Sequence, residues 1–397
     1  MRALAYLLLV MCVLSGAACD PSVSEPAEIA VISMGDGEAV LTETLRIDGY
    51  AEELTAVSYV AVGWDGTIAV DQRADQAIRF YTDDGELLGT FGREGQGPGE
   101  FTAMSRMGWI GDTLWVDDFD QARVTLISRD LALVRTISLP AGATLRSAFS
   151  DPPWPFVDPY GFPSDEEFLA SLRYNVGVPD ELRRTRTIAR LRFDGTVTSI
   201  IAAVPTGQSS ILIPGGSVAP PFPNASIEAV SPDGDMVAFV LATLDGPHAE
   251  TIEVAAWNAR GDTLFANRYP FAGEVIPAAV ADSVLEARLS RLQGRAPSNI
   301  VTAFQQNASV PPIYPPVTGL LVGMDHSVWI EMRATVGARS YAVLNSDGSP
   351  LGTARLPEHS RIAAAREDSI WVIERDALGV HSIVRYEVTW APQGEAQ

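Results

Sequence analysis

The sequence predicts an all-β protein, a six-bladed β-propeller, and two observations predict this fold. The first is internal repetition: short strand patterns of alternating apolar and polar residues recur along the chain, separated by Asp, Gly and Asn turns. The second is a last repeat that lacks one strand, together with an unpaired strand pattern near the N-terminus. A ring that the two ends of the chain close together accounts for both.

The first 18 residues are predicted to be an export signal. Arg2 precedes a short apolar run over residues 3–14, and small residues lead into Cys19. This run is too short to span a membrane. The segment resembles a bacterial lipoprotein signal, which implies lipidation of Cys19, although Gly16 stands where that pattern usually has Leu. The alternative is simple cleavage after Ala18, which would leave a soluble periplasmic protein.

Residues 19–37 are rich in Pro, Ser, Gly and acidic residues, and they are predicted to be a lipidated tether. Residues 38–397 are predicted to form the single propeller. Cys12 is lost with the signal, so at most one cysteine remains. The mature chain can therefore hold no internal disulfide and no metal site built on paired cysteines.

The charge balance excludes several classes of protein. The chain of 397 residues carries 28 basic and 50 acidic residues, a net charge of −22, and would repel a nucleic acid backbone. All of its basic residues are Arg, so Schiff-base catalysis by Lys and the P-loop lysine are excluded.

The repeat unit is clearest in the first third of the chain. DGTIAVD at 65–71 is echoed by GDTLWVD at 111–117, and weaker copies begin at Pro232, Met324 and Glu367. A hairpin pattern follows each unit. The copy that begins at His381 has only its first strand, and the unpaired pattern at 39–47 is predicted to supply the missing one.

The linker TFGREGQGPGEF at 90–101, followed by WVDDFDQAR, resembles the NHL repeat and related bacterial six-bladed propeller lipoproteins. The resemblance is clear in the first two blades and weaker in the rest. It implies the propeller fold but no particular activity, because such propellers act both as binding scaffolds and as enzymes.

The insertions can be sorted by face. With strands A to D named from the axis outward, the D→A and B→C connections share one face, which we call the D→A face. A segment at about 277–293 has apolar residues at helical spacing and is predicted to be an inserted amphipathic helix on this face, either a lid over a central pocket or a cover for apolar surface. The aromatic segment 151–167 is predicted to be an A→B connection, either a docking patch or a plug.

Three acidic residues are the ligand-face candidates. Asp71, Asp117 and Asp118 follow the B strands of the first two blades and are predicted to lie on the D→A face near the helix. The alternative is that they hydrogen-bond loop amides and contact no ligand.

Metal sites have weak support in the sequence. Aspartates recur at the A→B turns and could bind Ca²⁺, but Asp is also the common turn residue. His248, His359 and His381 share the D→A face and could hold Zn²⁺.

The sequence predicts an extracytoplasmic binding or scaffold protein, anchored only through lipid and facing the periplasm or cell surface. We expect a monomer whose partner is an envelope protein or a small molecule, and no required cofactor. The alternative function is a propeller hydrolase or lyase with a central metal.

Overall fold

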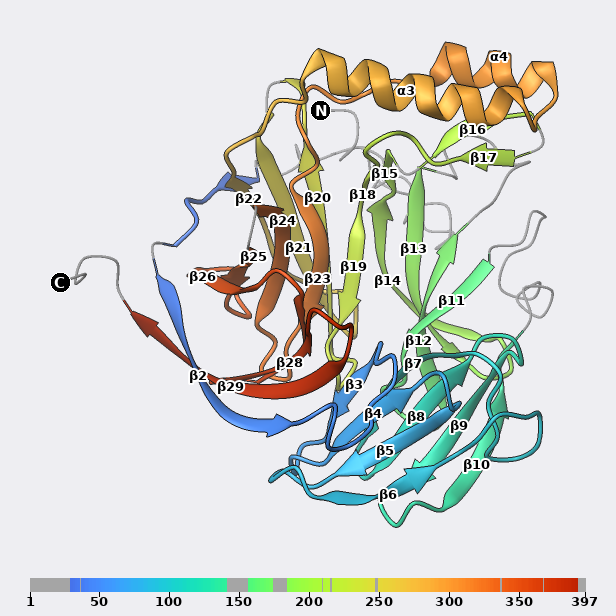
Figure 1. The fold of residues 1–397 in the computed structure, drawn as a ribbon, viewed down its shortest axis with the longest axis vertical. Helices are drawn as coiled ribbons and strands as arrows, with labels where there is room; N and C mark the ends of the chain where they lie inside the picture. The colour runs from blue at the N-terminus through green and yellow to red at the C-terminus, as the bar shows by residue number, and fades with distance from the viewer. Residues whose placement is uncertain are drawn as a thin grey trace, which may run out of the picture.

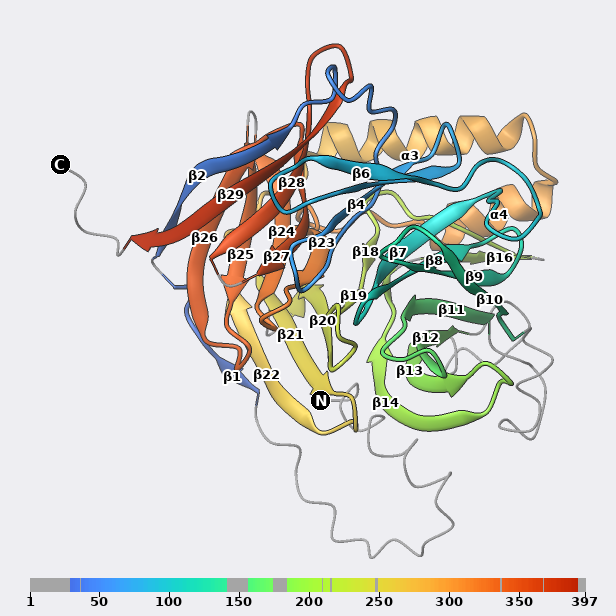
Figure 2. The same ribbon diagram turned by 90° about the horizontal axis from the view of Figure 1, so that it is seen from below.

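The computed structural model describes residues 29–35, 37–140, 156–173, 184–208, 210–214, 216–246, 249–335, 338–366 and 368–391. Within these ranges the strands form six antiparallel blades of four strands, arranged in a ring (Figure 2). The predicted six-bladed propeller is therefore confirmed.

The first three blades follow one another along the chain. Blade 1 contains β3 (Val60–Val62), β4 (Ile68–Gln72), β5 (Ala77–Tyr81) and β6 (Leu87–Phe91). Blade 2 contains β7 (Met104–Ile110), β8 (Thr113–Asp118), β9 (Arg123–Ser128) and β10 (Leu133–Ser138). Blade 3 contains β11 (Phe156–Gly161), β12 (Glu167–Arg173), β13 (Thr185–Arg192) and β14 (Val197–Pro205).

The last three blades include strands from both ends of the described chain. Blade 4 contains β19 (Ile227–Val230), β20 (Met236–Thr243), β21 (Thr251–Asn258) and β22 (Thr263–Pro270). Blade 5 contains β23 (Val317–Val322), β24 (Val328–Thr335), β25 (Ala338–Leu344) and β26 (Pro350–Pro357). Blade 6 contains β27 (Ser360–Arg366), β28 (Ser369–Arg375), β29 (His381–Ala391) and β2 (Glu38–Ile47).

The ring closes through β2, as predicted. This strand pairs antiparallel with β29, with Leu41 opposite Val388 and Ile47 opposite Ile383 (Figure 1). Its alternating pattern places Leu41 against the apolar cluster between blades 5 and 6, while Val40 is half exposed. The outer edge of the last blade is thus covered by a strand from the other end of the chain.

Part of the segment predicted to be a tether, residues 19–37, packs on the propeller. Ala30–Val31 form β1, which pairs parallel with β22 on the outside of blade 4. Ile32 and Met34 pack against the apolar cluster between blades 4 and 5, and the carbonyl oxygen of Gly37 accepts a hydrogen bond from Thr353 of β26 (2.8 Å). The apolar run at 29–32 therefore outweighs the Pro, Ser and Gly content of the segment. We call residues 29–37, without the undescribed residue 36, the N-terminal strap.

Apolar side chains fill all six junctions between neighbouring blades. Each junction has its own cluster of buried residues, including the junction between blades 6 and 1, where Ile47 and Ile383 meet Tyr81. The central strands of the blades are buried on both faces, as in β4, whose five residues are all buried, and a sheet can bury both faces only by packing against two neighbours. This is why the repeated strand pattern produces a ring.

Segment 151–167 is not an A→B connection, so this prediction needs correction. Its residues Phe156–Gly161 form β11, the innermost strand of blade 3. Phe162 is 2% exposed, and its ring centre lies 4.6 Å from that of Trp115 between blades 2 and 3. The alternation that marks a strand is interrupted here by Pro159 and by a bulge after it in the pairing with β12. The sequence therefore did not reveal the strand.

Two insertions emerge on the D→A face. The one between blades 3 and 4 contains β15 (Gly207–Gln208), β16 (Ile211–Ile213), β17 (Gly216–Val218) and β18 (Asn224–Ala225). The one between blades 4 and 5 contains α3 (Ala278–Gln293) and α4 (Ser298–Asn307), which lie side by side across the upper end of the ring (Figure 1). The structure therefore has the predicted helix and a second one. Pro297 is the N-cap residue of α4. Phe304 of α4 is buried, whereas α3 has no fully buried residue.

Candidate functional site

A cavity of about 240 Å³ runs along the centre of the ring. The six innermost strands, β3, β7, β11, β19, β23 and β27, contact one another in a closed circle around it. All six blades contribute to its wall, which is mostly apolar and includes Val60, Met107, Ala229, Leu320 and Ala364. We call this cavity the central channel.

The polar side chains of the channel wall gather toward the D→A face. Tyr59 directly precedes β3 and Arg106 is the third residue of β7, so both lie near the beginnings of inner strands. Tyr160 is the fifth of the six residues of β11, but its ring lies against Arg106 and its hydroxyl reaches Glu228, the second residue of β19. Ser231 lies toward the opposite end, where β19 turns into β20. Arg106 is the only charged residue among those that line the channel.

Arg106 is held in place by two contacts with blade 3. Its Nη1 donates a hydrogen bond to the carbonyl oxygen of Pro159, and its guanidinium lies 4.9 Å from the ring centre of Tyr160. No hydrogen bond from Nε or Nη2 to a described residue is present. Part of the guanidinium therefore stays available to a ligand while the remainder fixes its position.

Tyr160 connects this group to blade 4. Its hydroxyl donates to Oε2 of Glu228 (3.1 Å), which also accepts from Arg186 (2.8 Å). Burial raises the pKa of Tyr160, so its hydroxyl remains a donor at neutral pH. The carboxylate of Glu228 is 3% exposed and is neutralised by Arg186.

Three arginines bridge successive blades around this end of the channel. Arg361 of blade 6 donates to the carbonyl oxygen of Ser58, and Arg73 of blade 1 donates to that of Met104 (2.6 Å). Arg106 makes the same type of bond from blade 2 to blade 3. The guanidinium of Arg73 lies 5.9 Å from the ring centre of Tyr59, yet Arg73 does not line the channel.

Asp71 lies behind the channel wall and is 2% exposed. Its Oδ1 accepts hydrogen bonds from the backbone N–H groups of Ser58 (2.7 Å) and Tyr59 (2.9 Å). Its Oδ2 has no hydrogen-bond partner among the described residues, and the Nε of Arg73 is 3.9 Å away. Burial raises the pKa of Asp71.

Asp117 occupies the corresponding place in blade 2 and is 4% exposed. Its Oδ2 accepts a hydrogen bond from the hydroxyl of Ser105, and its Oδ1 has no hydrogen-bond partner within the described part of the chain. Burial raises the pKa of Asp117, and the nearby positive charge of Arg106 opposes this rise. Both aspartates thus hold the beginnings of inner strands.

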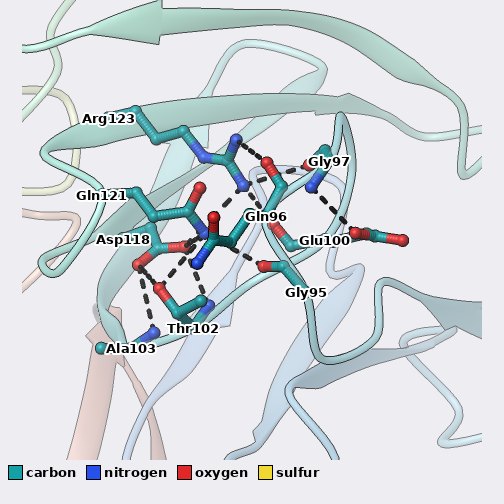
Figure 3. Close-up of polar contacts among 9 residues, drawn as sticks. All are labelled: Gly95, Gln96, Gly97, Glu100, Thr102, Ala103, Asp118, Gln121 and Arg123. Atoms are coloured by element: carbon teal, nitrogen blue, oxygen red, sulfur yellow. Dashed lines mark hydrogen bonds and ion pairs between the residues drawn. The ribbon is translucent and has the colours of Figure 1, made fainter.

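Asp118 is fully buried and points to Thr102 and Ala103 (Figure 3). Its Oδ1 accepts from the hydroxyl of Thr102 (3.0 Å) and the N–H of Ala103 (3.1 Å). Its Oδ2 accepts from the N–H of Thr102 (3.0 Å) and Nε2 of Gln121 (2.8 Å). These bonds tie the glycine-rich linker to blade 2, which matches the alternative that such acids hydrogen-bond loop groups.

Two of the three candidate histidines lie in the described part of the chain. Nδ1 of His381 accepts a hydrogen bond from the N–H of Val57 (2.8 Å), and burial lowers its pKa. His359 lies in the turn between β26 and β27, and His248 lies outside the described residues. No group of three or more His, Cys, Asp or Glu in the described ranges could hold a metal ion.

The turn aspartates hydrogen-bond within their own turns. Asp65 accepts from the N–H (3.1 Å) and hydroxyl (2.8 Å) of Thr67, and Asp325 accepts from the hydroxyl of Ser327 (2.7 Å). Two of them also reach a neighbouring blade: Asp65 pairs with Arg129 of blade 2 (3.0 Å), and Oδ2 of Asp233 lies 2.8 Å from Nε2 of His326 of blade 5. Here the turn interpretation accounts for the repeated Asp.

The sequence did not indicate Tyr59, Arg106 and Tyr160 as site residues. A usable signal exists for the first two: Tyr59 and Arg106 lie at or next to inner-strand positions opposite B-strand ends, so the DGTIAVD and GDTLWVD repeats locate them by register. Tyr160 lies opposite the middle of β12. The bulges in β7 and β11 shift the pairing register, so the strand pattern alone does not give these positions.

No protein-family model and no curated protein sequence matches the chain. Solved structures match across most of its length. They include an exported protein of Bacteroides fragilis (11% identity, TM-score 0.49, 91% of this chain and 100% of that one). They also include a DUF4221 family member of Bacteroides vulgatus (11% identity, TM-score 0.49, 90% of this chain and 99% of that one). A third is virginiamycin B lyase of Staphylococcus aureus (11% identity, TM-score 0.41, 88% of this chain and 100% of that one).

These likenesses concern the fold alone. Separately, none of the described helices is long and apolar enough to cross a membrane.

Proposed function

We propose that the protein is an extracytoplasmic propeller that binds a small ligand at the D→A end of its central channel. The observation that carries this proposal is the channel itself, whose wall is apolar and whose few polar side chains gather toward one end. Ligand sites are typically concave and apolar, with a small number of polar groups that fix orientation. A purely structural propeller would have no need of a partly free guanidinium there.

The size of the channel limits what can enter. A volume of about 240 Å³ exceeds the ~150 Å³ of an apolar cavity that is known to bind benzene. It is below the ~300–1,000 Å³ of sites that bury drug-sized molecules. The part of the ligand inside the channel is therefore a single ring or a short aliphatic group.

Filling the channel tests the proposal. Benzene should raise the melting temperature of the wild-type protein, because a ligand that binds only the folded state stabilises it. Ala364→Phe and Ala229→Phe, which fill the channel from two blades, should abolish this rise. Ala287→Phe on α3 adds the same ring outside the channel and should leave the rise intact. No rise in the wild type, or an equal rise in all four proteins, would refute channel binding.

We also propose that Cys19 carries a lipid anchor, in keeping with the resemblance to NHL-type propeller lipoproteins. Its support is the signal sequence, since Cys19 lies outside the described residues. Cys19→Ala should move the protein from the membrane fraction to the soluble fraction. A variant that remains membrane-bound would show that the lipid is not the anchor.

A further inference from the structure

We infer that the ligand of the central channel is a small carboxylate with an apolar body, and that Arg106 recognises its carboxylate group. This inference rests on the proposed function, because it names the ligand class for the same site. It depends on the charge inside the channel, the free edge of the guanidinium and the hydroxyl of Tyr59.

The charge of the channel wall differs from that of the whole chain. The chain carries −22, yet among the described residues that line the channel the only charged side chain is that of Arg106. Asp71 and Asp117 do not line the channel, because Asp71 accepts hydrogen bonds from Ser58 and Tyr59 and Asp117 accepts one from Ser105 behind the wall. A cationic ligand in the channel would be repelled by the guanidinium, whereas an anionic one would be attracted to it.

The guanidinium presents suitable donors. Its Nη1 is bonded to the carbonyl oxygen of Pro159 and its plane is supported by the ring of Tyr160, so little side-chain freedom remains to be lost on binding. The remaining N–H groups match the paired oxygens of a carboxylate.

Tyr59 supplies a second polar group at the same end of the channel. Its backbone N–H is bonded to Asp71, whereas no hydrogen bond from its hydroxyl to a described residue is found. A tyrosine hydroxyl at this end of the channel can donate a hydrogen bond to a carboxylate. The apolar body then lies toward Leu320 and Ala364, where the wall has no polar side chain to satisfy.

The experiment compares three probes of nearly equal size by titration calorimetry: benzoate, benzamide and benzylamine. Wild-type protein should bind benzoate about tenfold to a hundredfold more tightly than benzamide, the range expected for a charge-assisted hydrogen bond, and should bind benzylamine most weakly. Arg106→Met should remove the preference for benzoate while benzamide still binds.

Arg73→Met is the matched control. Arg73 also donates to the carbonyl oxygen of the next blade and lies over a tyrosine, but it does not line the channel. It should keep the full preference for benzoate. Equal loss in both variants would overturn the assignment, because a general disturbance of the ring would then explain the result.

Failure of the inference differs from failure of the proposed function. If benzamide binds as tightly as benzoate in the wild type, and Ala364→Phe abolishes both, the channel binds ligands but the carboxylate class is wrong. If none of the probes binds, and benzene gives no stabilisation either, the channel is not a ligand site.

Discussion

At the scale of single residues, several arginines of this propeller act across junctions between blades. Arg361, Arg73 and Arg106 each bond a backbone carbonyl of the following blade, and Arg339 of blade 5 donates to the carbonyl oxygen of Glu358, which precedes blade 6. The junction between blades 4 and 5 has a pair of a different kind. There the contact is between His326 and Asp233, on the face opposite the D→A face.

This pair should make stability depend on pH. The hydrogen bond that His326 donates to Asp233, together with the negative charges of Asp233, Asp235 and Asp325, raises the pKa of His326, while burial opposes the rise. A group whose pKa is raised on folding stabilises the fold while protonated, and this contribution disappears as pH rises through the folded-state pKa. The pKa of Asp233 is lowered to about 2, so its contribution disappears only in strong acid.

We therefore expect His326→Asn to destabilise the protein at about pH 6 and to matter less at about pH 9. Asn tolerates the backbone at this position, where φ is +65°. Urea unfolding of both proteins at the two pH values measures the difference. A difference in unfolding free energy that stays constant or grows with pH would contradict the argument.

At the scale of elements, β2 is the strand on which ring closure depends. Ile47 is 2% exposed and packs with Ile383 and Tyr81 between blades 6 and 1, whereas Val40 of the same strand is 52% exposed. Ile47→Ala should cost about 2–5 kcal/mol of unfolding free energy. Val40→Ala should stay within about 0.5 kcal/mol. Chemical denaturation measures both, and equal losses would mean that β2 does not seal this junction.

The elements differ in how far the sequence predicts them. The strands of blades 1, 2 and 6 follow from period-two alternation, and β2 from the strand missing after His381. The strand β11 was missed because Pro159 and a bulge interrupt its alternation, and with it Tyr160 was lost from the candidate site. The second helix was missed because Ser298–Asn307 is short, with only ten residues.

The candidate site was predictable only in part. The sequence placed Asp71, Asp117 and Asp118 at B-strand ends, but it could not give the direction of each side chain. Asp117 and Asp118 are adjacent, so they point to opposite faces of the sheet, Asp117 to Ser105 and Asp118 to the linker. The residues of the channel wall depend on all six blades meeting at one axis, which no local pattern encodes.

At the scale of the whole molecule, the N-terminus holds the ring in two ways. The strap lies over blades 4 and 5 through β1, Ile32 and Met34, and β2 then completes blade 6. The segment between Cys19 and β1 is only residues 20–29, which extended would reach about 35 Å. If Cys19 is lipidated, the outer edge of blade 4 is therefore kept close to the membrane surface.

The two roles of the N-terminus can be separated with chains that begin at residues 29, 38 and 48. The first keeps every described contact and should melt like the mature protein. The second loses the strap, including half-buried Ile32 and Met34. Each of these two should contribute to the unfolding free energy roughly half of the ~1.5–3 kcal/mol of a fully buried side chain. The third also loses β2, which exposes the edge of β29 and opens the junction at Tyr81, so it should be the least stable and the most prone to aggregate. Melting temperatures and solubility should fall in that order.

If the chain that begins at 48 melts like the one that begins at 38, the strand from the N-terminus contributes nothing to closure. The junction between blades 6 and 1 would then be held by the remaining residues of those two blades alone.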